Sequence, residues 1–296
     1  MTNKNDRTAI CIVGDSRSGS SIFQGLIQLH KDATAVGELR RLEQFVAQGL
    51  PCSCGKPIGQ CEHWQAVMQR AGLRADEIRS QPPRWKALRR VDEIVGFGGV
   101  ALRLTGLTRH LFFDGAVAAN HCARLLDAAC EQAGARVVVD NSKDPGHAVY
   151  LLHQRIIPVH VAFIVRDGRA TVWSKMRRTG ISLEQATRHW ARTTYAMLAL
   201  SRVIGPQHSS WLRYEDLCAD PRQMIGGFVE RLGLDPRNFG GEQNELHHHI
   251  GGTPDFSGAD FDAVREDKRW RSEMPVDSLT QFESIAGKLN RRLGYT

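Results

Sequence analysis

The chain has 296 residues, of which 42% are hydrophobic and 24% charged, and its formal net charge is +7. This composition is that of an ordinary globular protein, and it argues against a disordered chain, a collagen and a coiled-coil rod. No stretch approaches the roughly 18 uncharged apolar residues of a membrane-spanning helix, and the N-terminus carries no apolar signal region. We therefore expect a cytoplasmic protein with no membrane span.

The positive charge is spread over both halves of the chain. Residues 1–148 hold 19 basic and 15 acidic residues, and residues 149–296 hold 20 and 17. Because neither half has a basic tail, we do not expect nucleic acid as a partner. Residues 166–192 are more basic, with seven Lys or Arg against two Asp or Glu, a balance of +5. This segment indicates either an anionic ligand or a solvated helix face, and composition alone leaves both open.

The first elements of the chain are typical of an α/β fold. A short, apolar, β-branched run at 8–14 predicts a buried strand, a glycine-containing turn follows, and residues 20–29 have helical spacing. Two later apolar runs, at 136–140 and 159–165, also predict interior strands, and each precedes a turn and an amphipathic segment. We therefore expect a P-loop-like α/β fold with a parallel sheet flanked by helices.

Residues 38–133 show mostly helical patterns and predict a helical insertion after the first βα unit. Such an insertion usually shapes an acceptor pocket or lid. Further along, the patterns predict a helix from about 181 to 203, a strand at 210–214 and a helix near 221–232. The remainder of the chain, with its paired glycines, is expected to be irregular. Because no linker or repeat interrupts these patterns, we expect one domain over residues 1–296.

Residues Gly14 to Ser21 have the G-x-x-x-x-G spacing of a phosphate-binding loop, between a predicted strand and a predicted helix. Backbone N–H groups and the helix N-terminus at such a place form an anion cradle. A P-loop kinase needs Lys at position 20 to reach the phosphates, whereas this chain has Ser20 there and its cation at Arg17. A kinase is therefore the weaker enzyme interpretation, and an ordinary glycine turn is the structural alternative.

Two further segments place cations after predicted strands. Arg166 follows the strand at 159–165, with Ser174 about two turns into the next helix, and Lys143 lies just past the strand at 136–140. In open α/β sheets, ligands bind at the carboxyl ends of the strands. Together with the glycine loop, these cations predict a ligand with two separated phosphate groups, although Lys143 also fits a loop charge in water.

In combination, these segments resemble the sulfotransferases that use 3′-phosphoadenosine 5′-phosphosulfate (PAPS). The run Arg17-Ser18-Gly19-Ser20-Ser21 is similar to the family's 5′-phosphosulfate loop, and Arg166 with Ser174 to the pair that holds the 3′-phosphate. Residues 213–217 and 247–270 resemble later family segments. The resemblance covers most of the chain in order. It implies transfer of a sulfuryl group from PAPS to a hydroxyl, with no metal required.

A narrower resemblance is to the tyrosylprotein-sulfotransferase branch and its bacterial relatives, carried by Gly37-Glu38-Leu39-Arg40 and Asn141-Ser142-Lys143-Asp144-Pro145. It implies that Glu38 is the catalytic base and that Lys143 and Arg17 stabilise the transition state. For a base, we expect burial to raise the pKa of Glu38 toward the working pH; the structural alternative is an acid that starts a helix. Further donor contacts implied by the resemblance are Arg178, Tyr214 and Arg269, and the contact near residues 253–257 stays open.

The acceptor is not identified by the sequence. The chain lacks the membrane anchor and disulfides of secretory-pathway members, which favours a small molecule, a glycan or a lipid over a protein tyrosine. A noncatalytic nucleotide-binding module is the alternative outside the enzymes, and it predicts a basic stripe with interleaved aromatic residues, which is not present. The oligomeric state, including a homodimer, stays open.

Seven scattered cysteines without a signal peptide do not predict a disulfide framework. Cys52, Cys54, Cys61 and His63 have a C-x-C-x₆-C-x-H spacing that can hold Zn²⁺, although it is not the spacing of a standard finger. A cysteine pair or free thiols in the acceptor lid are the preferred interpretations, and zinc stays open. The run 247–249, three histidines, could suggest a metal site, but a polar turn is preferred because adjacent side chains diverge.

Overall fold

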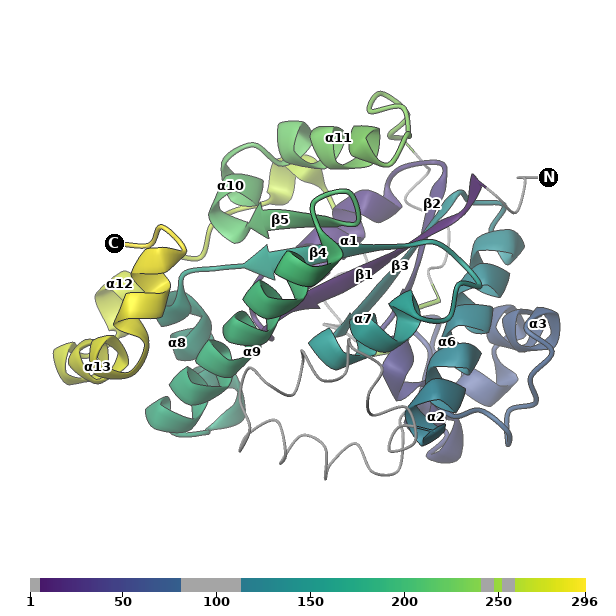
Figure 1. Ribbon diagram of the computed structural model, residues 1–296, viewed down its shortest axis with the longest axis horizontal. Helices are drawn as coiled ribbons and strands as arrows, with labels where there is room; N and C mark the ends of the chain where they lie inside the picture. The colour runs from purple at the N-terminus through teal and green to yellow at the C-terminus, as the bar shows by residue number, and fades with distance from the viewer. Residues whose placement is uncertain (1–5, 81–112, 241–247, 252–258) are drawn as a thin grey trace.

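The core of the fold is a five-stranded parallel sheet (Figure 1). The computed structural model describes residues 6–80, 113–240, 248–251 and 259–296. The strands lie in the order β2-β3-β1-β4-β5. Their bounds are β1 (Thr8–Gly14), β2 (Ala33–Gly37), β3 (Val137–Lys143), β4 (Val159–Val165) and β5 (Ser209–Arg213). Because every pairing is parallel, the carboxyl ends of all five strands meet at one edge.

The central strands are apolar because both of their faces are covered. All seven residues of β4 are buried, and so are six of the seven in β1. Cys11 and Val13 of β1 pack into one hydrophobic cluster, while Ile10 and Ile12 point into a second cluster on the opposite face. This alternation is the period-two geometry of a strand with a core on each side.

Helices cover both faces of the sheet. The first cluster contains residues of α2 (Leu42–Ala47), α3 (Glu62–Arg70), α6 (Phe113–Gln132), α7 (Pro145–Leu152) and α9 (Leu183–Ile204). The second contains residues of α1 (Ser20–Gln28), α10 (Tyr214–Ala219) and α11 (Pro221–Arg231). Short 3₁₀ turns are η2 (Leu39–Arg41), η3 (Ile58–Gln60) and η6 (Phe261–Ala263). Figure 1 shows this three-layer arrangement.

A third cluster joins the C-terminal helices to the rest of the molecule. It is built from α8 (Gly168–Thr179) and α9 together with α12 (Trp270–Glu273) and α13 (Val276–Arg292). Trp190 of α9 and Phe282 of α13 meet at its centre, with their ring centroids 5.7 Å apart. The expectation of an irregular remainder after the helix at 221–232 was therefore wrong for α13, whose apolar stripe packs on α9.

The expected parallel α/β fold is confirmed, with one strand that the sequence did not predict. β2 is a short strand, Ala-Thr-Ala-Val-Gly, whose one neighbouring strand among the described residues is β3, and Ile250 forms a single bridge to Gly37 on its other side. Ala and Gly are depleted in strands, so local propensity gives little signal here. Helices α2, α3 and α6 lie within the expected insertion, whose residues 81–112 lie outside the described part. None of the described helices is both long and apolar enough to cross a bilayer.

Candidate active site

The turn between β1 and α1 has the backbone of an anion-binding loop. Arg17 and Gly19 both have positive φ, 72° and 91°, and α1 begins directly afterwards at Ser20. The ring of Tyr214 lies against Gly19, where an added Cβ would overlap the ring. Only glycine therefore fits at position 19, and the N–H groups at the start of α1 stay open to an anion at the helix N-terminus.

Arg17 and Ser174 are in direct contact, although 157 positions separate them in the chain. Arg17 Nε donates to Ser174 Oγ across 3.1 Å. Arg166 comes from the end of β4, where the side chain of Asp167 caps α8 by accepting from the N–H of Arg169. The Arg166 guanidinium donates to the carbonyl of Arg17 across 3.1 Å. The predicted loop and the predicted Arg–Ser pair therefore form one cluster.

A cavity of about 290 Å³ lies beside this cluster. Its lining includes five side chains that the sequence singled out: Arg17, Arg166, Ser174, Arg178 and Arg269. It also includes Trp173, Arg177 and Trp270, which the sequence analysis did not select. Helical spacing could have found Arg177, because it lies three residues after Ser174 on α8. The cavity is a basic pocket with an aromatic wall.

Tyr214 joins the cavity wall to the C-terminal segment. The Arg166 guanidinium lies over the Tyr214 ring, 4.3 Å from its centroid. Tyr214 Oη accepts from the N–H of Asp267 across 3.0 Å, and burial raises the pKa of Tyr214 to about 12. Arg269 donates to Asp267 and lowers the pKa of that carboxyl to about 2. Tyr214 is therefore a neutral phenol that positions Arg166 and the segment around Asp267.

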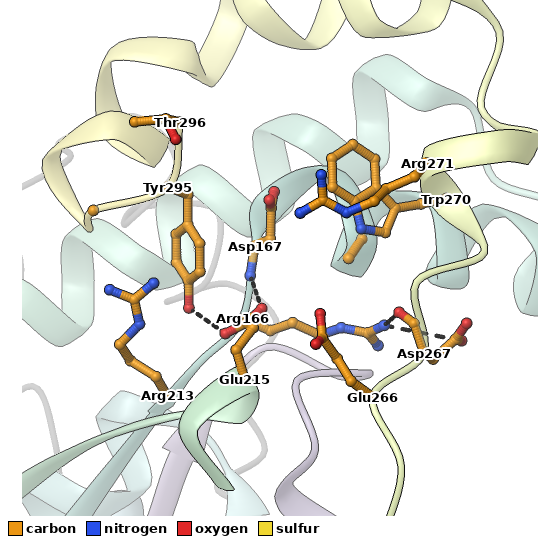
Figure 2. Close-up of a pocket in the computed structure, with 12 residues that line it drawn as sticks. Arg166, Asp167, Arg213, Glu215, Glu266, Asp267, Trp270, Arg271, Tyr295 and Thr296 are labelled. Atoms are coloured by element: carbon orange, nitrogen blue, oxygen red, sulfur yellow. Dashed lines mark hydrogen bonds and ion pairs between the residues drawn. The ribbon is translucent and has the colours of Figure 1, made fainter. Parts of the chain in front are cut away.

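On its other side, Arg166 borders a second cavity in which the charged groups already bind one another (Figure 2). Glu215 accepts hydrogen bonds from Tyr295 Oη, across 2.8 Å, and from the backbone N–H of Asp167, across 3.0 Å. The Arg213 guanidinium lies over the Tyr295 ring. These contacts fasten the C-terminus to the end of β5, so Arg213 and Glu215 of the predicted segment 213–217 have a structural role.

Glu38 and Lys143 form an ion pair at the ends of β2 and β3. Lys143 Nζ donates to Glu38 Oε1 across 2.7 Å and to the carbonyl of Asn141 across 3.1 Å. Lys143 has a φ of +63°, a left-handed conformation between the end of β3 and the Asp144 cap of α7. The base and the cation that the sequence selected 105 positions apart are therefore neighbours, and neither lines the cavity beside Arg17.

The pKa of Glu38 moves opposite to the expectation from burial. Burial by itself raises this pKa, but the Lys143 ammonium and the Arg41 guanidinium outweigh it, so the pKa lies below its ordinary value of 4.5. Arg41 Nη1 donates to Glu38 Oε2 across 3.2 Å. The expected rise toward the working pH was therefore wrong for the free protein, because two cations face a carboxylate that is only partly buried.

A buried carboxylate that the sequence analysis missed holds the segment after β2, with Glu38, against the end of β3, with Lys143. Asp140 is fully buried and accepts from the N–H of Leu39, across 3.3 Å, and from Ser142 Oγ, across 2.5 Å. His147 Nε2 lies 2.7 Å from its second oxygen. Asp140 therefore fixes the residue after Glu38 and the residue before Lys143, and only the fold could reveal this.

The basic segment 166–192 divides into separate roles. Of its seven cations, Arg166, Arg177 and Arg178 line the cavity. Lys175 is buried and pairs with Asp15, 2.6 Å from Oδ2, so it positions the turn after β1. Arg188 pairs with Glu184 at the exposed surface of α9. The solvated-face interpretation therefore holds for Arg188, whereas an anionic ligand stays a prediction for the three arginines that line the cavity.

The family of the chain follows from its sequence match. A family model described as the sulfotransferase family matches residues 9–238. The chain belongs to the sulfotransferase family. The matched range contains the turn after β1, Glu38, Lys143 and Arg166, whereas Arg269 lies beyond it. No curated protein sequence matches the chain significantly.

Two solved structures share the fold of this sulfotransferase. The sulfotransferase domain of the olefin synthase of Synechococcus PCC 7002 superimposes with a TM-score of 0.50 at 20% identity, covering 97% of both chains. The sulfotransferase domain from the curacin biosynthetic pathway has a TM-score of 0.56 at 17% identity and covers 98% of both chains. At these identities the likeness concerns the fold, and the resemblance to the tyrosylprotein branch stays a prediction.

Proposed function

We propose that this sulfotransferase moves a sulfuryl group from PAPS to a hydroxyl of a small molecule, glycan or lipid. Glu38 acts as general base, and Lys143 and Arg17 stabilise the transition state. The observation that carries the proposal is the distribution of selected side chains along the carboxyl edge of the sheet. Glu38 follows β2, Lys143 ends β3, Arg17 follows β1 and Arg166 follows β4, in the spatial order of those strands.

The residues around the turn after β1 fit a doubly phosphorylated nucleotide. Ser18 Oγ and Arg166 Nε are buried and have no hydrogen-bond partner among the described residues. Buried polar atoms without partners are rare, so a bound anion is a natural partner for them. Arg178 and Ser174 line the same cavity and supply contacts for the 3′-phosphate. The backbone of Ser18 to Ser21 supplies N–H donors for the 5′-phosphosulfate.

The proposed reaction is an in-line displacement at sulfur. The acceptor oxygen forms a bond to the sulfuryl sulfur while the bond from sulfur to the bridging phosphate oxygen breaks. Glu38 takes the acceptor proton, and adenosine 3′,5′-bisphosphate leaves with the electron pair of the broken bond. By analogy with phosphoryl transfer, catalysis rests on positioning and on cations near the developing charge. Lys143 and Arg17 supply those cations.

The Glu38–Lys143 pair gives the donor a way to activate the base. In the free protein, Lys143 keeps Glu38 ionised by lowering its pKa. When Lys143 Nζ turns to the bridging oxygen of the donor, Glu38 loses its strongest cationic partner. Its pKa then rises, which makes it a better proton acceptor at the moment of transfer. Turnover is therefore expected to fall on the acid side, as pH passes down through the pKa of Glu38.

The first test is a screen with ³⁵S-labelled PAPS against a phenol, a sugar, a lipid alcohol and a tyrosine peptide. Label transfer to one class supports the proposal and identifies the acceptor. Transfer only to the peptide would overturn the acceptor assignment. No transfer to any class, combined with no binding of PAPS in calorimetry, would overturn the function.

Thermal shift separates the alternatives. Adenosine 3′,5′-bisphosphate is expected to raise the melting temperature, whereas ATP with Mg²⁺ is not, because position 20 carries Ser20 instead of the P-loop lysine. Stabilisation by ATP with Mg²⁺ alone would favour a kinase. Stabilisation by the bisphosphate without label transfer would favour a noncatalytic nucleotide-binding module.

A further inference from the structure

Three cysteines and a histidine from distant parts of the chain meet next to the candidate active site. Cys52 and Cys54 lie in the turn between α2 and η3, Cys61 precedes α3, and His248 comes from the short described segment 248–251. Their three Sγ atoms and one His nitrogen all lie within 4.8 Å of one another. No catalytic role described above uses any of them.

The distances within this cluster suit one tetrahedral metal ion. Cys54 Sγ and Cys61 Sγ are 3.7 Å apart, and His248 Nδ1 lies 3.7 Å from Cys52 Sγ and 3.2 Å from Cys61 Sγ. A tetrahedral Zn²⁺ with Zn–S distances of about 2.3 Å sets its sulfurs about 3.8 Å apart. A disulfide needs sulfurs about 2.05 Å apart, and all three cysteines are free.

The backbone turns back after Cys54, which keeps Cys52 and Cys54 close together. Gly55, with a φ of +85°, turns the chain after Cys54, and its N–H donates to the carbonyl of Cys52 across 2.9 Å.

The fourth ligand is not the histidine that the spacing suggested. His63 stacks on His248 with parallel rings 4.5 Å apart, whereas it is His248 whose Nδ1 faces the sulfurs. Two backbone-mediated contacts hold His248 there: Ser53 N–H donates to the carbonyl of His249, and His249 N–H donates to Ser53 Oγ. Of the run 247–249, for which a polar turn was expected, His247 lies outside the described residues, and His248 reaches the cysteine turn.

We propose that Cys52, Cys54, Cys61 and His248 bind one Zn²⁺. Zinc displaces the three thiol protons, which pass to solvent, and the four ligands close its coordination shell. The ion is therefore structural, and it ties the start of the helical insertion to segment 248–251. Ile250, two residues after the ligand, accepts from the N–H of Glu38 across 2.7 Å. The zinc site thereby fixes the segment that lies beside the proposed base.

This close approach also constrains β2. An added Cβ at Gly37, which has a φ of +75°, would come within 2.5 Å of the Ile250 carbonyl oxygen. The ligand segment therefore lies directly on the backbone before Glu38. This inference stands independently of the donor and the acceptor, because metal content can be measured without turnover.

The test is elemental analysis of the full chain, purified under reducing conditions with zinc in the growth medium. We expect one zinc per chain, loss of zinc in Cys54→Ser and His248→Gln, and retention in His63→Gln. Cys218→Ser, whose thiol lies outside the cluster, is the matched cysteine control. Loss of zinc in His63→Gln with retention in His248→Gln would overturn the ligand set.

A second measurement uses the wild-type chain and therefore does not depend on whether the variants fold. Replacing zinc by Co²⁺ in the wild-type chain should give a thiolate-to-cobalt charge-transfer band and the visible bands of a tetrahedral site. Removing the metal with a chelator should lower the melting temperature, and adding Zn²⁺ should restore it. Reduced protein that contains no zinc and gives no thiolate–cobalt band would overturn the proposal, as would a Cys54–Cys61 disulfide in mass spectrometry.

Discussion

Arg178 offers a sharp test of the proposed donor pocket because its side chain is exposed and lines the cavity beside Arg17. Arg178→Gln should therefore leave the fold intact and remove one charged contact to the 3′-phosphate. A hydrogen bond to a charged group contributes about 1.5–3 kcal/mol, so the dissociation constant for adenosine 3′,5′-bisphosphate should rise roughly 10- to 150-fold. Isothermal titration calorimetry measures this change directly.

A second nucleotide tests whether the lost affinity comes from the 3′-phosphate. Adenosine 5′-monophosphate lacks the 3′-phosphate, so Arg178→Gln should leave its affinity almost unchanged. Arg188→Gln makes the same substitution on the exposed face of α9, where Arg188 pairs with Glu184, and should change neither affinity. Equal weakening of both nucleotides by Arg178→Gln, or no weakening of either, would refute the assignment of this arginine to the 3′-phosphate.

Three further predictions concern the proposed base, Glu38, and the turn after β1. Glu38→Gln keeps the side-chain size but cannot accept a proton, so kcat should fall about 10²- to 10⁴-fold while the affinity for the bisphosphate is kept. Glu184→Gln is the control and should turn over normally. Near-normal turnover of Glu38→Gln would refute the assignment of Glu38 as the base. Lys175→Met removes the ammonium that pairs with the buried carboxylate of Asp15, so the free energy of unfolding in urea should fall by about 3–5 kcal/mol. Arg188→Met, at the exposed surface, should lower it by less than about 1 kcal/mol. Contacts with His189 and Lys175 outweigh the effect of burial and hold the pKa of Asp15 below its ordinary value of 3.8, so its stabilising contribution is present above that pH and is lost as pH falls further. Unfolding measured between pH 7 and about pH 2 should show this loss in the wild type and a smaller one in Asp15→Asn.

The sequence predicted the strands whose own residues are apolar along most of their length. Runs such as 8–14 and 159–165 are apolar because both of their faces are buried, so composition alone identifies them. β2 gave no such signal because it is a short strand of small residues whose conformation depends on pairing with β3. The same limit applies to α13, whose position depends on packing against α9.

For the site, the sequence identified side chains but not their partners. The motif around Arg17 and the carboxylate of Glu38 could be found from spacing and resemblance. The pairing of Glu38 with Lys143, and with it the direction of the Glu38 pKa, depends on contacts across 105 positions. His248 shows the same limit, because a neighbour in sequence, His63, looked like the better fourth ligand.

The amino-acid sequence by itself therefore determined the α/β class, the glycine turn between β1 and α1, and the family of this protein. Each of these depends on short segments, in which buried apolar runs and glycine turns leave a local pattern. Only the tertiary structure decided which cations of segment 166–192 face the cavity, which group tunes Glu38, and which histidine joins the three cysteines. Those outcomes depend on distances between segments far apart in the chain. Coulombic interaction and metal coordination act through those distances in space, and local sequence spacing does not encode them.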